Sequence, residues 1–164
     1  KKSDLLEPSL IQLSSLMRYK LYDTDGSKIS LEKECEYLQS YIGLQRQRFS
    51  DKMPINVTII PSEKEYEIES MLLIPFVENA FKHGTGMLEN PKIDINLHTT
   101  NDKLFFSVSN KFNPASQEIK DNANGIGLAN VQRRLDLLYP KDHILKLEEK
   151  GNEFIVSLQI NLTA

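Results

Sequence analysis

Runs in which apolar and polar residues alternate constrain the fold of this 164-residue chain more than any other feature. Ile55, Val57 and Ile59 show this pattern, which is typical of a strand with one face in the core. Asn101-Asp102 separates two such runs, and this arrangement predicts a hairpin. The predicted strands span residues 55–59, 93–97, 104–108, 143–149 and 153–162.

Apolar residues at helical spacing predict four helices. These helices span residues 4–22, 30–49, 73–84 and 127–138. Ser30 is a suitable N-cap for the second helix, and Pro75 fits the first turn of the third. Residues 66–70 are expected to form a short strand or an extended link. From residue 51 onward this order predicts an α/β sandwich with helices on one face of a mixed sheet, preceded by a helical segment at residues 1–50.

Composition narrows the class of protein. The charge balance gives no electrostatic argument for nucleic-acid binding, because 20 basic residues stand against 23 acidic ones. The single cysteine, Cys35, excludes an intramolecular disulfide and favours a reducing compartment. Cys35 falls on the apolar side of its predicted helix, which favours a small core residue over a nucleophile. Because Lys1-Lys2-Ser3-Asp4 is not a natural start, we expect the chain to be a piece of a longer protein.

The predicted helix at residues 73–84 has a polar face that suits a phosphate and a metal ion. Asn79, Lys82 and His83 share this face, because they are three and four residues apart, and Glu78 lies beside them. Mg²⁺ takes oxygen ligands, and a lysine ammonium supplies a point charge to a phosphate. A solvated polar face with an ion pair between Glu78 and Lys82 explains the same residues, and composition alone favours that interpretation.

A glycine-rich turn precedes the last predicted helix. Gly125 and Gly127 are one residue apart, so the backbone there can approach a ligand closely. The following helix would present its N-terminal N–H groups to an anion. The turn ends a long polar stretch, residues 110–125, and loops of that length are often functional. An ordinary turn into a helix accounts for the two glycines equally well.

Several familiar sites are absent from the sequence. There is no Walker A motif, no dinucleotide-binding glycine fingerprint and no Gly-x-Ser-x-Gly elbow. His83, His98, His143 and Cys35 lack the spacing of a zinc site. A parallel nucleotide-binding fold, a zinc site and a serine hydrolase are therefore not predicted.

Four segments, taken in order, resemble one family. Residues 75–84 resemble the N-box of the GHKL ATPase superfamily, in the wording of its LytS-like sensor histidine kinases: Pro-Phe-Val-Glu-Asn-Ala-Phe-Lys-His-Gly. Residues 125–135 resemble the second glycine box and the helix after it. Residues 13–19 are similar to a Leu-Ser-x-Leu-x-Arg-Tyr segment of that family, and residues 31–49 to the helix that enters the ATP domain. The resemblance covers nearly the whole chain.

The resemblance implies a role for each polar residue of the N-box. Asn79 would ligate a Mg²⁺ ion that bridges the ATP phosphates, and Lys82 and His83 would contact phosphate. Glu78 would position or deprotonate the attacking group. Phosphoryl transfer needs mainly positioning and charge neutralisation, so these few groups could suffice.

The resemblance also implies how the base and the lid of the ATP site are formed. The first glycine box of the family, Asp-x-Gly-x-Gly, is replaced here at residues 110–114. Asn110 stands where the family has the aspartate that binds the adenine amino group, and its amide oxygen can accept that hydrogen bond. Gly125, Gly127 and Leu128 form the second glycine box, next to a lid at about residues 111–124.

The function implied by the resemblance is that of the ATP-binding catalytic domain of a two-component sensor histidine kinase. Residues 51–164 would be this domain, and residues 1–50 a remnant of the dimerisation and phosphoacceptor region. ATP and Mg²⁺ would be the cofactors, and the γ-phosphoryl group would pass to a histidine upstream. Because no Pro-His-Phe motif occurs here, this piece is expected not to autophosphorylate alone.

The implied partners are a cognate response regulator and a second copy of the parent protein. Direct contact with nucleic acid is not expected. The parent would be a bacterial sensor anchored in the inner membrane, and this chain would be part of its cytoplasmic portion. The alternative is a degenerate GHKL module that acts in dimerisation or partner docking without ATP turnover. A third alternative, a GHKL ATPase or serine kinase, is disfavoured by the segment at residues 13–19.

Overall fold

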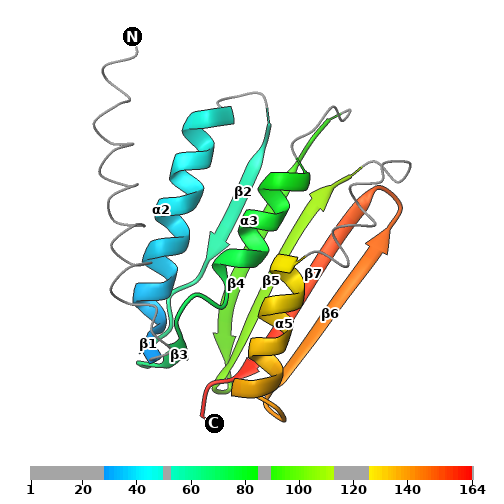
Figure 1. Ribbon diagram of the computed structural model, residues 1–164. Coiled ribbons are helices and arrows are strands. Elements are labelled where there is room, and N and C mark those ends of the chain that lie inside the picture. The colour runs from blue at the N-terminus through cyan, green and yellow to red at the C-terminus, as the bar shows by residue number, and fades with distance from the viewer. Residues whose placement is uncertain (1–27, 50–52, 85–89, 113–125, 164) are drawn as a thin grey trace.

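A five-stranded mixed sheet forms the centre of the fold (Figure 1). The computed structural model describes residues 28–49, 53–84, 90–112 and 126–163. The strand order is β2-β4-β5-β7-β6, where β2 and β4 are parallel and the other neighbours are antiparallel. The strands are β2 (Ile55–Ile59), β4 (Ile93–Thr100), β5 (Lys103–Lys111), β6 (His143–Lys150) and β7 (Glu153–Asn161).

Three helices cover one face of this sheet (Figure 1). They are α2 (Leu31–Phe49), α3 (Ile74–His83) and α5 (Ile126–Leu138). The predicted α/β sandwich is therefore confirmed for the described part of the chain. Ser30 caps α2 as predicted, because the Lys33 N–H donates to its hydroxyl at 3.1 Å. The helix predicted at residues 4–22 lies outside the described residues, as does the lid from residue 113 onward.

The core lies between the helices and the sheet. Along β5 every second side chain is buried, and β7 shows the same alternation. Phe76 of α3 packs against Phe106 of β5, with ring centroids 6.3 Å apart. Cys35 is half-buried and packs against this core, as its place on the apolar side predicted. Each strand thus turns one face to the helices, which is why a period of two predicted the sheet.

The turns match the residues that form them. Asn101 and Asp102 have positive φ angles of 52° and 62°, which a two-residue hairpin turn requires. The hairpin between β4 and β5 is therefore confirmed. Gly151, with a φ of 59°, turns the chain between β6 and β7.

A small second sheet was only half predicted. Its strands are β1 (Lys28–Ser30) and β3 (Glu67–Glu69), which pair antiparallel. β3 confirms the short strand that was one of the two expectations for residues 66–70. β1 was not predicted, because Ser30 was interpreted only as the N-cap of the following helix. Its partner strand β3 is distant in sequence, so no local pattern predicts the pairing.

No described helix is both long and apolar enough to cross a membrane.

Candidate functional site

Helix α3 carries the predicted phosphate-binding residues on the boundary between core and solvent. Its apolar side is buried, including Val77 and Ala80, as predicted. Glu78 and Asn79 are half-buried, His83 is half-buried, and Lys82 is exposed. The C-terminal half of α3 therefore carries a carboxylate, an amide, an ammonium and an imidazole that are at least partly exposed.

The C-terminal end of α3 meets β5 at Asn110. The Gly84 N–H donates to the Ala80 carbonyl oxygen at 2.7 Å and closes the helix. A Cβ atom on Gly84 would lie 2.6 Å from that oxygen and 2.7 Å from the Asn110 Cβ, so no larger residue fits without a shift. The contact brings the last turn of the N-box segment against the residue that was predicted to bind adenine.

Asn110 is almost fully buried, with 4% of its surface exposed. Its Nδ2 donates to the Lys111 carbonyl oxygen at 3.1 Å. This bond fixes the orientation of the amide, because a buried polar group needs a partner. The sheet therefore holds the Asn110 side chain in a defined place beside the end of α3.

Helix α5 lies beside α3 on the same face of the sheet (Figure 1). Gly127 falls in its first turn, and Leu128 is buried in the hydrophobic core. Gly125 lies outside the described residues. The described part of the second glycine box is therefore the start of helix α5, and Leu128 packs into the core there.

Helix α2 adds an aromatic cluster that the sequence analysis missed. Tyr41 contacts Phe81 of α3 edge-to-face, with centroids 5.9 Å apart, and Phe49 stacks on the same ring at 6.2 Å. Burial and, to a smaller extent, the negative charge of Glu78 raise the pKa of Tyr41 to about 12, against the opposing effect of Arg48. Glu78 therefore acts electrostatically on a side chain of α2, so α2 borders the candidate site.

The chemistry of Cys35 agrees with a structural role. Burial, together with the negative charges of Glu34, Glu32 and Glu36, raises its pKa to about 12. Cys35 is therefore a neutral thiol at neutral pH, which is a poor nucleophile. Among the described residues, no three His, Cys, Asp or Glu side chains gather closely enough to hold a metal ion by themselves.

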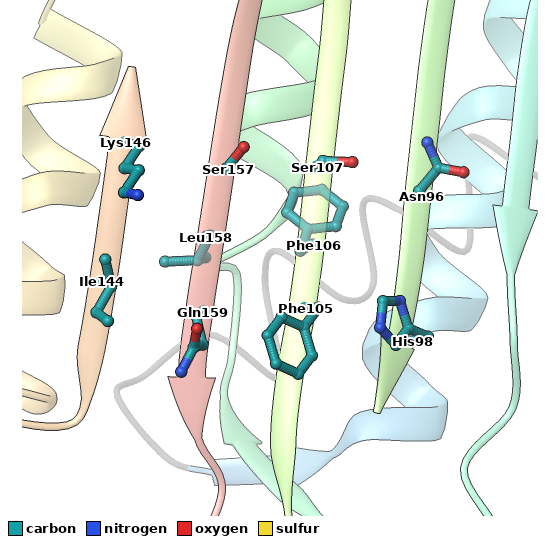
Figure 2. Close-up of a pocket in the computed structure, with 10 residues that line it drawn as sticks. All are labelled: Asn96, His98, Phe105, Phe106, Ser107, Ile144, Lys146, Ser157, Leu158 and Gln159. Carbon is teal, nitrogen blue, oxygen red and sulfur yellow. The ribbon is translucent and has the colours of Figure 1, made fainter. Parts of the chain in front are cut away.

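A separate cavity of about 320 Å³ lies on the other face of the sheet (Figure 2). Its floor is formed by Ser107 and Ser157, which are partners across β5 and β7. His98 stacks on Phe105 at its rim, with centroids 5.1 Å apart. None of the residues predicted to bind a ligand lines this cavity.

Sequence comparisons identify relatives of one kind. A family model described as histidine kinase matches residues 1–53. The sensor protein LytS of Oceanobacillus iheyensis is 27% identical over 158 residues, which cover 87% of this chain and 27% of that protein. The sensor histidine kinase YpdA of Escherichia coli is 28% identical, covering 88% of this chain and 27% of that protein. The chain spans about a quarter of the length of these curated relatives.

Solved structures show the same fold. The catalytic domain of histidine kinase ThkA superposes with a TM-score of 0.59, at 17% identity, over 84% of this chain and 96% of that chain. ThkA has also been solved in complex with the response regulator protein TrrA, with a TM-score of 0.56, at 17% identity, over 97% of this chain and 50% of that chain. The chain is therefore a relative of the LytS-like sensor histidine kinases, and its fold is that of a histidine kinase catalytic domain.

Proposed function

We propose that this chain binds Mg·ATP at the C-terminal end of α3 and is the catalytic part of a two-component sensor histidine kinase. The observation that carries the proposal is the contact between Gly84 and Asn110. It joins the polar face of the N-box helix to the residue at the adenine position, at one end of the sheet. Residues 51–164 would form the catalytic domain.

Four side chains of α3 fit the phosphate end of the nucleotide. The amide oxygen of Asn79 would ligate Mg²⁺, which keeps most of its waters and needs few protein ligands. Lys82 is exposed, so its ammonium can reach a phosphate, and His83 lies beside it. Glu78 would position or deprotonate the attacking imidazole. The Mg²⁺ ion would neutralise charge that develops between the phosphates.

Asn110 fits the adenine end. Its Nδ2 donates within the protein, so its amide oxygen would be the atom that accepts a hydrogen bond from the ligand. Because an amide lacks the charge of the aspartate in the family motif, the hydrogen bond would be weaker than a charge-assisted one. Gly125, Gly127 and Leu128 would border the lid.

The reaction and the partners follow from the same proposal. The γ-phosphoryl group would pass to a histidine upstream in the parent protein, so this piece would not autophosphorylate alone. The parent would be a membrane-anchored bacterial sensor, with this chain on the cytoplasmic side. It would dimerise through the region to which residues 1–50 belong. A response regulator would accept the phosphate, and the complex of ThkA with TrrA supports this kind of partner.

Calorimetric titration with Mg·AMP-PNP tests nucleotide binding. We expect saturable binding that Asn79→Ala weakens by about tenfold or more, because the variant loses the metal ligand. Asn96→Ala is the matched control, since Asn96 is an exposed amide on the opposite face of the sheet. It should bind like the parent chain. No binding at millimolar nucleotide would refute the proposal and favour a docking module without ATP turnover.

A further inference from the structure

The connector, residues 69–73, joins β3 to α3 and is buried except at Met71, which is half-buried. Ser70, Leu72 and Leu73 have no exposed surface. Met71 has a φ of 62°, in the left-handed region that an ordinary side chain rarely adopts. Such a conformation persists only when the surrounding structure stabilises it, so contacts of the connector must hold Met71 in place.

Glu34 of α2 holds the amide side of the connector. Its fully buried carboxylate accepts hydrogen bonds from the Met71 N–H at 3.2 Å and the Leu73 N–H at 3.4 Å. Leu73 is the N-cap residue of α3 and has no side-chain cap of its own, and the first turn of α3 contains no acidic residue. The Glu34 carboxylate of α2 thus lies at the N-terminus of α3, where a negative charge is favourable.

Arg134 of α5 holds the carbonyl side of the connector. Its guanidinium donates from Nη1 to the Met71 oxygen at 3.1 Å and from Nη2 to the Ser70 oxygen at 2.7 Å. The planar fork of arginine suits two consecutive acceptors, and a lysine lacks this fixed geometry. Tyr139, just after α5, accepts a hydrogen bond from the Glu69 N–H at 3.1 Å. The backbone of Met71 is therefore hydrogen-bonded on both sides: its N–H to Glu34 of α2 and its carbonyl oxygen to Arg134 of α5.

The hydrogen bonds from Glu34 and Arg134 to the connector lie at the N-terminal end of α3, whereas Asn110 lies at its C-terminal end. Asn110 belongs to the sheet, whereas Asn79 is carried by α3, whose first turn directly follows the connector. A shift of the connector would move Asn79 relative to Asn110 without moving Asn110 itself. We infer that Glu34 and Arg134 are positioning residues, which fix the phosphate half of the proposed ATP site against its adenine half.

The inference rests on the proposed function, and it predicts a split between two ligands. Glu34→Gln and Arg134→Met should weaken Mg·AMP-PNP binding by about tenfold, because a misplaced ligand-bearing helix lowers metal affinity. Binding of adenosine, which contacts only the adenine half, should change less than about twofold by the same reasoning. Both titrations can be followed by NMR.

Matched controls separate positioning from general destabilisation. Glu36→Gln and Arg133→Met change exposed neighbours of the same charge. Val156→Ala lowers stability through a buried side chain of β7, away from the connector. All three should leave the ratio of the two affinities unchanged. Should Arg134→Met fail to fold, Arg134→Lys gives the same test, because a lysine keeps the charge but does not reproduce the rigid two-pronged contact of the guanidinium.

Amide hydrogen exchange of the ligand-free chain gives a second measure. Arg134→Met should increase exchange at the amides of Ile74, Phe76 and Val77 in α3 more than Val156→Ala does at equal overall stability. Equal weakening of both ligands, or the same ratio change in Val156→Ala, would overturn the inference. If the parent chain binds neither ligand, the proposed function fails, and the exchange comparison alone decides whether Glu34 and Arg134 position α3.

Discussion

The two ends of α3 are held in different ways. At its N-terminal end, Leu72, Leu73 and Ile74 have no exposed surface, and side chains from α2 and α5 bind the backbone. At its C-terminal end, Phe81 is buried and Gly84 packs against Asn110, but Lys82 is exposed. Both ends of the helix are packed, and only the C-terminal end also presents polar groups to solvent. This division lets a rigid scaffold position groups that remain accessible to a ligand.

The largest expected effect is at the C-terminal end, where Gly84 leaves no space for a side chain. Gly84→Val should lower the free energy of unfolding by about 3 kcal/mol, because the added atoms overlap Ala80 and Asn110. Gly151→Ala is the contrasting change. Its Cβ would meet no atom within 4 Å, so only its positive φ costs energy, about 1 kcal/mol. Urea unfolding measures both, and equal losses would contradict the close contact with Asn110.

At the N-terminal end, Arg134→Met should lower the free energy of unfolding by about 2 kcal/mol, because two buried carbonyl groups lose their donors. Arg133→Met removes an exposed arginine one residue earlier and should change stability by less than about 0.5 kcal/mol. Chemical denaturation of the two variants gives the comparison. A loss in Arg133→Met as large as in Arg134→Met would mean that the hydrogen bonds to the connector contribute little.

A smaller effect is expected at Tyr139, whose hydroxyl accepts one backbone N–H. Tyr139→Phe keeps the buried ring and removes only that acceptor, so we expect a loss of about 1 kcal/mol. Thermal unfolding followed by circular dichroism can measure the change. A variant as stable as the parent chain would show that Glu69 finds another partner.

The smallest effect, absent at neutral pH, concerns Cys35 beside Glu34. The folded-state pKa of about 12 is above the ordinary value of 9.0, so the stabilising contribution is complete below pH 9 and is lost as pH rises toward 12. The free energy of unfolding should therefore fall between pH 9 and 11. In Cys35→Ala the fall should be shallower, and identical slopes would contradict the burial of this thiol. Urea unfolding at several pH values makes the measurement.

The sequence predicted the sheet and the three described helices because their apolar periods are strong and local. β7 and β5 alternate clearly, and Ser30 and Pro75 mark where helices begin. β1 was missed because its three residues pair with β3, far away in sequence. Local patterns do not record such pairings, since only the folded chain brings the two strands together.

The candidate site was predicted in part. Asn79, Lys82 and His83 could be identified from their spacing and from the family motif, and their roles remain predictions. The contact of Gly84 with Asn110 and the hydrogen bonds that hold Met71 could not be predicted, because they join elements that are distant in sequence. Glu34 and Arg134 in particular are charged residues on helices, and a sequence pattern assigns such residues to a solvated face. Only the fold shows that both point inward to the connector.

Nuclear magnetic resonance mapping of Mg·AMP-PNP binding tests the central claim most directly. The claim is that the nucleotide binds at the C-terminal end of α3, between its polar face and Asn110. The account predicts the largest amide shift changes at residues 79–84 and 110–112, with small changes at the connector. The largest changes at residues 96–98 and 105–107, around the cavity on the open face of the sheet, would contradict it, as would no change at saturating nucleotide.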